Sequence, residues 1–100
     1  MIGSVIQYDS ILAVWDENGT KVGTLSIGGG EMLGYSNKFI LLRYGDLIIT
    51  TDADQRQLGS TVVPGGYQIC GITNSGFLAK TGNILQVYDT HCNHVGIQSI

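Results

Sequence analysis

The sequence contains few charged residues. Asp, Glu, Lys and Arg make up 13% of its 100 residues, about half of the roughly 25% that is usual in globular domains. A small domain has much surface for its volume and needs polar side chains to cover it. We therefore expect other copies of the chain to cover part of this surface, as in a homo-oligomer. The net charge of −3 comes with no basic stripe, which argues against nucleic acid as a partner.

Long apolar runs are also missing. None approaches the roughly 18 residues that a membrane-spanning helix needs. Residues 1–15 are interrupted by Asp9 and have no basic start of the kind found in signal peptides. These absences predict a cytoplasmic protein with no membrane partner. Cys70 and Cys92 form no CxxC pattern, so we expect two free thiols rather than a disulfide framework.

What the sequence does contain is a repeated unit. The stretch GNILQVYD occurs three times in related form, at residues 82–89, 45–52 and 9–16. Each copy ends in an aspartate and is followed seven residues later by a glycine, namely Gly23, Gly59 and Gly96. Aligned in this way, one expected domain over residues 1–100 divides into the repeats 1–27, 28–63 and 64–100. Pro64 is the single inserted residue.

Each full repeat is expected to form a meander of four short strands. In the third repeat these are residues 68–73, 76–80, 84–89 and 95–100, separated by Gly, Asn and Asp turn residues. The first repeat begins at the equivalent of Asn37 and lacks the opening strand, which leaves about eleven strands. No stretch keeps an apolar period of 3.6 over about ten residues, so no helix is predicted.

The turns have recognisable residues. Asp16, Asp52 and Asp89 are expected to open hairpins by accepting backbone N–H groups in Asx turns. The pair Asn18-Gly19 predicts a tight hairpin, since both residue types tolerate positive φ. The glycines at 28–30 and 65–66 precede no helix, so they are expected to join repeats rather than to bind phosphate.

The third strand of each repeat is apolar on both faces. In the first repeat Leu12 and Val14 alternate with Ile11, Ala13 and Trp15. An antiparallel sheet with one face in water would instead alternate apolar and polar residues. The pattern therefore predicts sheets that are stacked on both sides.

These repeats resemble β-propeller blades. The resemblance lies in the four-stranded meanders and in the third strand ILQVYD, without a WD or kelch signature. It implies an all-β fold of sheets stacked around an axis. Propellers have about four to eight blades, and this chain has fewer than three complete ones. The resemblance therefore implies a ring closed by oligomerisation, with six blades in a dimer.

A second, weaker resemblance is to monocot mannose-binding lectins, which are β-prism proteins with three repeats of Gln-x-Asp-x-Asn-x-Val-x-Tyr. Gln7 and Asp9 match the start of this motif, and Tyr88 matches its end in the third repeat. Most of the polar sugar-contacting positions are replaced. This resemblance implies a threefold β-prism, or a β-trefoil-like monomer, that binds carbohydrate and closes within one chain.

Two sets of side chains are candidates for binding a small molecule or sugar. Gln7, Arg43 and Lys80 share one repeat position, which in a ring would lie near one mouth. They could bind an anionic or sugar ligand, or be solvated strand ends. Flat ligands could instead stack on the aromatic residues Trp15, Tyr44 and Tyr88, whose alternative role is packing.

One dense cluster could bind a metal. His91, Cys92 and His94 could hold zinc with a fourth ligand from elsewhere, but they also occupy the position of a hairpin turn. No cofactor is predicted. Because the aspartates are equivalent between repeats, they indicate turns rather than catalysis. The sequence thus predicts a non-enzymatic binding or assembly module, with a carbohydrate-binding domain as the alternative.

Overall fold

The computed structural model describes residues 1–63 and 67–99. These residues form eleven β-strands and no helix, which confirms the all-β prediction. The strands are β1 (Ile2–Tyr8), β2 (Ile11–Asp16), β3 (Lys21–Ser26), β4 (Glu31–Tyr35), β5 (Ile40–Tyr44), β6 (Leu47–Thr51), β7 (Gln57–Val62), β8 (Gln68–Thr73), β9 (Gly76–Thr81), β10 (Ile84–Asp89) and β11 (His94–Ser99). The described residues therefore include no helix that could cross a membrane.

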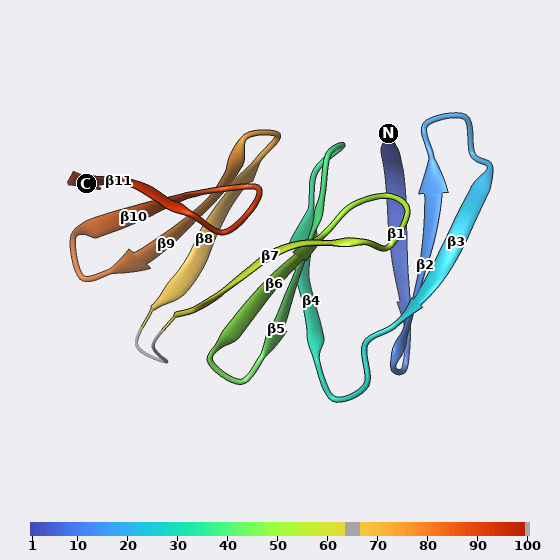
Figure 1. Ribbon diagram of the computed structural model, residues 1–100, viewed down its shortest axis with the longest axis horizontal. Coiled ribbons are helices and arrows are strands. Elements are labelled where there is room, and N and C mark those ends of the chain that lie inside the picture. The colour runs from blue at the N-terminus through green and yellow to red at the C-terminus, as the bar shows by residue number, and fades with distance from the viewer. Residues whose placement is uncertain (64–66, 100) are drawn as a thin grey trace.

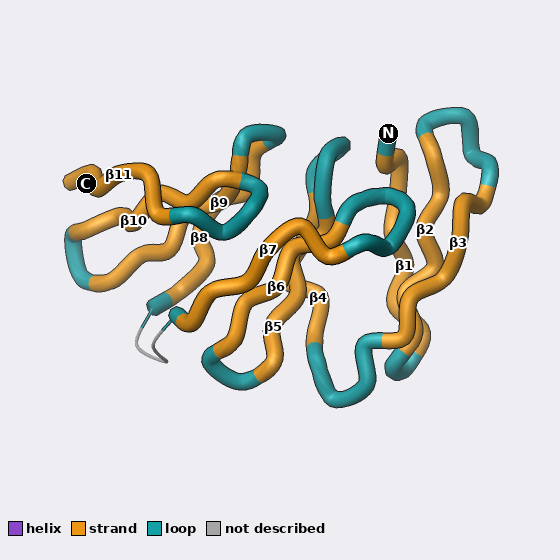
Figure 2. Tube along the Cα trace, in the orientation of Figure 1, coloured by secondary structure: helices purple, strands orange, loops and turns teal. Residues whose placement is uncertain are grey.

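The strands form three separate antiparallel meanders. Sheet 1 has the order β1-β2-β3, sheet 2 the order β4-β5-β6-β7, and sheet 3 the order β8-β9-β10-β11 (Figures 1 and 2). Strand β1 pairs with β2 as β5 pairs with β6 and β9 with β10. Sheet 1 thus has no counterpart of β4 and β8, which confirms that the first repeat lacks the opening strand.

The predicted strand limits in the third repeat are close to those observed. Strands β8 and β10 have the predicted bounds, and β9 ends one residue later at Thr81. Strand β11 begins one residue earlier, at His94. Its predicted end at Ile100 lies outside the described residues, as do Pro64 and the glycines at 65–66.

Sheet 2 lies between the other two sheets (Figure 1). On the inner strand β5 of this sheet, Ile40 and Leu42 belong to a buried apolar cluster shared with sheet 1. Leu41, between them, belongs to a second cluster shared with sheet 3. Alternating side chains of one strand thus enter two cores, and the predicted burial of both faces is confirmed for this sheet.

The two cores are separate, and the described residues show no closure of the three sheets around a common axis. One core lies between sheets 1 and 2 and the other between sheets 2 and 3. A self-closed β-prism or β-trefoil needs three units that pack around one centre. The structure instead has consecutive sheets stacked in a row (Figure 2).

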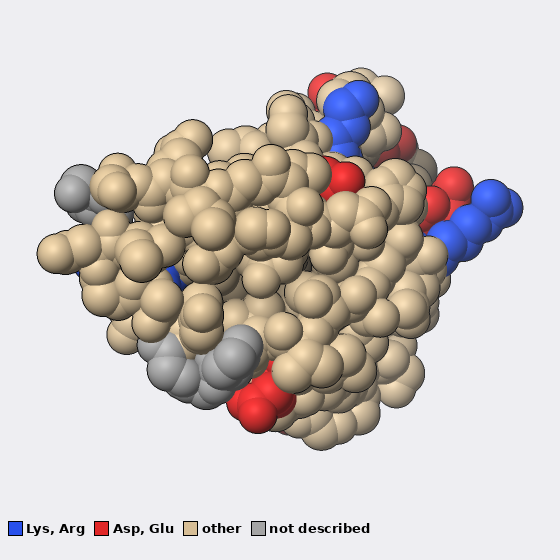
Figure 3. Space-filling view, turned by 60° about the vertical axis from the view of Figure 1, so that its left-hand side comes forward, with Lys and Arg blue, Asp and Glu red and all other residues tan. Residues whose placement is uncertain are grey.

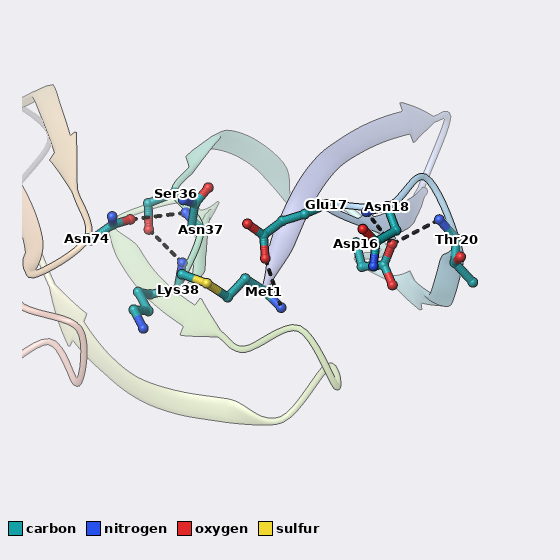
Figure 4. A network of polar contacts seen from close by, with 9 residues as sticks. All are labelled: Met1, Asp16, Glu17, Asn18, Thr20, Ser36, Asn37, Lys38 and Asn74. Atoms are coloured by element: carbon teal, nitrogen blue, oxygen red, sulfur yellow. Dashed lines mark hydrogen bonds and ion pairs between the residues drawn. The ribbon is translucent and has the colours of Figure 1, made fainter.

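The three aspartates open hairpins as predicted. The Oδ1 atom of Asp16 accepts the backbone N–H groups of Asn18 and Thr20, each at 2.9 Å (Figure 4). Asp52 and Asp89 accept the N–H groups two and four residues ahead, again at 2.9 Å. One carboxylate oxygen thus satisfies two backbone donors in every repeat.

The hairpin predicted at Asn18-Gly19 is present, and of these two residues Gly19 alone has positive φ. Only the third residue after each aspartate has positive φ, at 79° for Gly19, 63° for Gln55 and 65° for Cys92. The backbone N–H of Asp16 donates to the carbonyl of Thr20 at 2.9 Å, so the loop has three residues rather than two. Such a loop combines a turn with one left-handed residue at a bulge.

A second hairpin type joins β1 to β2, β5 to β6 and β9 to β10. Its first loop residue is left-handed in all three sheets, at φ 53° for Asp9, 63° for Gly45 and 58° for Gly82. Asp9 therefore occupies a position where the other two repeats have glycine. A left-handed conformation costs a residue with a Cβ atom more than it costs glycine.

We predict that Asp52→Ala lowers the free energy of unfolding by about 1–2 kcal/mol, because two backbone N–H groups lose their acceptor. The matched control is Asp54→Ala in the same hairpin. Asp54 is exposed, and this change should stay within about 0.5 kcal/mol. Urea unfolding followed by circular dichroism measures both. Equal effects of the two changes would contradict the role given to Asp52.

We predict that Asp9→Gly raises the free energy of unfolding by about 0.5–1 kcal/mol, because glycine relieves the left-handed strain at φ 53°. Asp9→Ala should lower it, since alanine keeps the Cβ atom and loses the polar side chain. Thermal unfolding of the two variants checks the sign of each change. A lower melting temperature for Asp9→Gly would disprove the prediction.

Candidate functional site

The three polar side chains predicted to bind a ligand lie on three different sheets. Nε2 of Gln7 donates to the carbonyl of Asp9 at 3.0 Å, and Nε of Arg43 donates to the carbonyl of Gly45 at 2.8 Å. Lys80 is exposed at the same position of β9. Gln7 and Arg43 therefore each hold the short hairpin that follows their own strand.

Two of the three candidate aromatic residues lie in the cores. Tyr44 packs against the cluster between sheets 1 and 2. Tyr88 packs against the other cluster and stacks on Phe77, with ring centroids 4.9 Å apart. Burial, followed by the proximity of Tyr67 and Cys92, raises the pKa of Tyr88.

Trp15 is the candidate aromatic residue that lies away from both cores. It alternates with Val14, which belongs to the core between sheets 1 and 2, so its ring is on the opposite face of sheet 1. The ring is half-buried, and Nζ of Lys21 lies 6.0 Å from its centroid.

The three candidate metal ligands have different partners. Cys92 is buried, with its sulfur 3.6 Å from Oγ1 of Thr50, and burial raises its pKa. His91 and His94 are exposed, and Nε2 of His94 lies 2.5 Å from Oε1 of Gln86. In residues 1–63 and 67–99, no group of three or more His, Cys, Asp or Glu side chains could hold a metal ion.

A contact that the sequence did not predict joins the Asp52 and Asp89 hairpins to the sheets that precede them. A Cβ atom at Gly23 on β3 would lie 2.6 Å from Oε1 of Gln55, in the Asp52 hairpin. At Gly59 on β7 a Cβ atom would collide with the carbonyl of His91, in the Asp89 hairpin. These two glycines therefore leave room for the hairpin of the next sheet.

A hydrogen bond adds to this contact between sheets 2 and 3. The hydroxyl of Thr50 donates to the carbonyl of Thr90 at 2.6 Å, and Thr50 itself is fully buried. At the other end of these sheets, the backbone N–H of Asn37 donates to Oδ1 of Asn74 at 3.1 Å (Figure 4). The carbonyl of Asn37 accepts the N–H of Ile2 at 2.9 Å, which links sheet 2 to sheet 1.

The described part of the chain has no pocket, so the candidate functional surfaces are the two outward sheet faces. We call the face of sheet 1 away from sheet 2 the N-face; its apolar residues are Ile6, Tyr8, Ile11, Ala13 and Trp15, and the polar Ser4 and Thr24 lie on the same face. The face of sheet 3 away from sheet 2 is the C-face, with Leu78, Leu85, Val87 and Gly96 beside the polar Lys80 and Gln98. In Figure 3 the side formed by sheet 3 comes forward, and few charged side chains are visible on it.

Residues of the N-face have repeat equivalents that are buried elsewhere. Ile6 is 45% exposed, whereas its equivalents Leu42 and Ala79 are 2% and 0% exposed in the two cores. Tyr8 is 58% exposed, whereas its equivalent Tyr44 packs against a core. The N-face thus has the composition of a sheet–sheet interface without the neighbouring sheet.

The C-face shows the same difference. Leu85 is half-buried, whereas its equivalents Leu12 and Ile48 are 0% and 1% exposed. Nearby on β11, Val95 is 60% exposed; of its two equivalents, Leu58 packs against the core between sheets 2 and 3, and Val22 is 43% exposed. Both ends of the stack therefore leave apolar side chains without a partner sheet.

Comparison with family models, with curated proteins and with solved structures found no match to this chain.

The pKa of Asp89 lies below its usual value, chiefly because the backbone N–H of Asn93 donates to its carboxylate; burial opposes this shift, and the backbone N–H of His91 lowers the pKa further. A lowered folded-state pKa adds stability that is present above the unfolded-state pKa and is lost as the pH falls through the folded-state pKa. In Asp89→Asn the amide oxygen can still accept hydrogen bonds, but the negative charge is gone.

We predict that Asp89→Asn is less stable than the wild type near neutral pH and that this difference disappears in acid. Urea unfolding at a series of pH values, from about pH 7 to about pH 2, measures it. A difference that stays constant over this range would contradict the prediction.

Proposed function

We propose that this protein is a non-enzymatic assembly module in which two chains associate to form one ring of six propeller-like sheets. The observation that carries the proposal is the exposure of Ile6 and the partial exposure of Leu85 at positions whose equivalents are buried inside the stack. Burying such side chains gives about 25 cal/mol for each Å² of apolar surface removed from water. Association would supply the neighbour that each end face lacks.

The aspartates support a structural role. The carboxylates of Asp16, Asp52 and Asp89 each accept two backbone hydrogen bonds in equivalent hairpins. A group held in this way by its own turn stabilises the fold. We therefore assign these repeated carboxylates to hairpin formation and not to acid–base chemistry.

A ring also suits the order of the sheets. Each sheet packs on the next one in the chain, with sheet 2 sharing one core with sheet 1 and another with sheet 3. Propellers close with about four to eight such sheets. Two chains bring six sheets to the ring, although sheet 1 has three strands instead of four.

Carbohydrate binding, the alternative suggested by the lectin resemblance, has less support. Of the three aromatic residues that could stack on a sugar, Tyr44 and Tyr88 pack against the cores, and Trp15 lies on the N-face. In the proposed ring Trp15 would itself be covered by a second chain. Ring formation and sugar stacking on Trp15 would therefore compete.

We predict a mass of two chains of 10.7 kDa each in light scattering at micromolar concentration. Because the faces are apolar, the mass should change little when the salt concentration rises. The control is Val62→Arg, which places a charge at a residue that is 65% exposed on β7, outside both faces. A wild-type mass of one chain would overturn the proposal.

A further inference from the structure

The aspartate hairpins fit against the preceding sheets in a repeated manner. The Asp52 hairpin of sheet 2 lies against Gly23 of sheet 1, and the Asp89 hairpin of sheet 3 lies against Gly59 of sheet 2. Gly23 and Gly59 occupy the same repeat position, on the last strand of their sheets. At Gly59 a side chain would meet the backbone of the hairpin, whereas at Gly23 it would meet the end of the flexible Gln55 side chain.

One glycine and one hairpin remain without this contact. Gly96 has the corresponding position on β11, but a Cβ atom there would meet only Cβ of Val87, at 4.0 Å. Its φ is not in the left-handed region, so the backbone does not require glycine either. The hairpin from Asp16 to Thr20 belongs to sheet 1, and no sheet among the described residues precedes it.

We infer that the Asp16 hairpin of a second copy of this chain packs against Gly96, so that the C-face of one chain meets the N-face of the next. This inference rests on the proposed function and specifies its interface. It gives Gly96 the role that Gly23 and Gly59 have within the chain. In the assembly, a hairpin of the next sheet then packs against the glycine of the third repeat, as it does against those of the first two.

The side chains of the two faces fit this orientation. Leu85 and Val87 of the C-face correspond to Ile48 and Thr50, which are buried toward sheet 3. Ile6 and Trp15 of the N-face correspond to Ala79 and Tyr88, which pack toward sheet 2. Where sheets 2 and 3 meet within the chain, sheet 2 contributes the equivalent of the C-face. Sheet 3 contributes the equivalent of the N-face.

Such a contact joins two different surfaces and is heterologous. An isologous dimer would instead place one face against the same face of the partner. Two C-faces would bring two copies of Gly96 together and leave the Asp16 hairpins without contact. The two arrangements predict different effects of changes made on one face only.

The first test uses Gly96→Arg and Ile6→Arg, each of which obstructs one face. Both positions are open in the single chain, so both variants should fold with the circular dichroism spectrum of the wild type. The inference predicts that each variant alone has the mass of one chain, while the control Val62→Arg keeps the wild-type mass. A variant that retains the wild-type mass shows that the face it changes is not used, which overturns the inference.

Mixing the two variants tests the pairing itself. The unchanged C-face of Ile6→Arg can still bind the unchanged N-face of Gly96→Arg. The inference therefore predicts that sedimentation of an equimolar mixture shows a species of two chains at concentrations where each variant alone is a monomer. Because one contact is weaker than the two of a closed ring, the mixture is measured up to about 1 mM, where contacts of about 4 kcal/mol are detectable.

Disulfide trapping gives a second measurement that needs no strong association. Asn18 corresponds to His91, which contacts Gly59, so Asn18→Cys and Gly96→Cys place thiols on the two sides of the contact. Both changes are made in a Cys70→Ser background, which removes the exposed native thiol. The inference predicts covalent pairs of one Asn18→Cys chain with one Gly96→Cys chain after mild oxidation.

The trapping experiment separates failure of this inference from failure of the proposed function. A wild-type protein that is monomeric at all concentrations overturns both. A wild-type dimer in which Gly96→Cys chains link only to one another leaves the assembly proposal standing and overturns the heterologous contact. A wild-type dimer with no mixed product also overturns the contact at Gly96.

Discussion

The packing of one hairpin against a glycine of the preceding sheet is the contact on which the stacking depends. The Asp89 hairpin approaches β7 so closely that a Cβ atom at Gly59 would collide with the carbonyl of His91. The hairpin itself is fixed by two hydrogen bonds to the Asp89 carboxylate. A rigid turn and a strand without a side chain thus set how near the two sheets can lie. The aspartate and the glycine recur together in all three repeats.

Once the sheets are stacked in this way, both faces of the middle sheet are buried and must be apolar. Ile40 and Leu42 enter one core while Leu41 and Ile48 enter the other. Within the core between sheets 2 and 3, the hydroxyl of the buried Thr50 donates across the sheets to the carbonyl of Thr90 at 2.6 Å. A buried hydroxyl needs such a partner, because an unpaired one costs about 1–3 kcal/mol. The low charge content of the chain follows from having two sheet–sheet cores in 100 residues.

Much of the fold could be predicted from local features of the sequence. The Asx turns were predictable because an aspartate that accepts backbone N–H groups needs only its own neighbours, and the short strands because Gly, Asn and Asp separate them. The positive φ of Gln55 and Cys92 was not predictable, since neither residue type favours it. Both residues occupy the position of Gly19 in a hairpin of the same geometry, and this geometry requires the positive φ.

The candidate site was harder to predict, because its residues are identified by contacts between repeats. Gln7 and Arg43 look like ligand-binding side chains until their bonds to the carbonyls of Asp9 and Gly45 are seen. Gly23 and Gly59 look like weak points of their strands until the neighbouring hairpins are in place. The repeat period shows that these glycines recur at one position, but it cannot show which sheet the tip of a hairpin contacts.

The two end faces of the stack differ, so a contact between the C-face of one chain and the N-face of another is heterologous. In heterologous association every added chain presents a new free C-face, so growth stops only when the last C-face reaches the first N-face. Whether this happens depends on the rotation from one sheet to the next, which the hairpin–glycine contact sets twice within the chain. If the contact between chains repeats that geometry, the same rotation accumulates around the whole assembly. Whether the assembly closes into a ring or continues as an open filament is then set by that rotation.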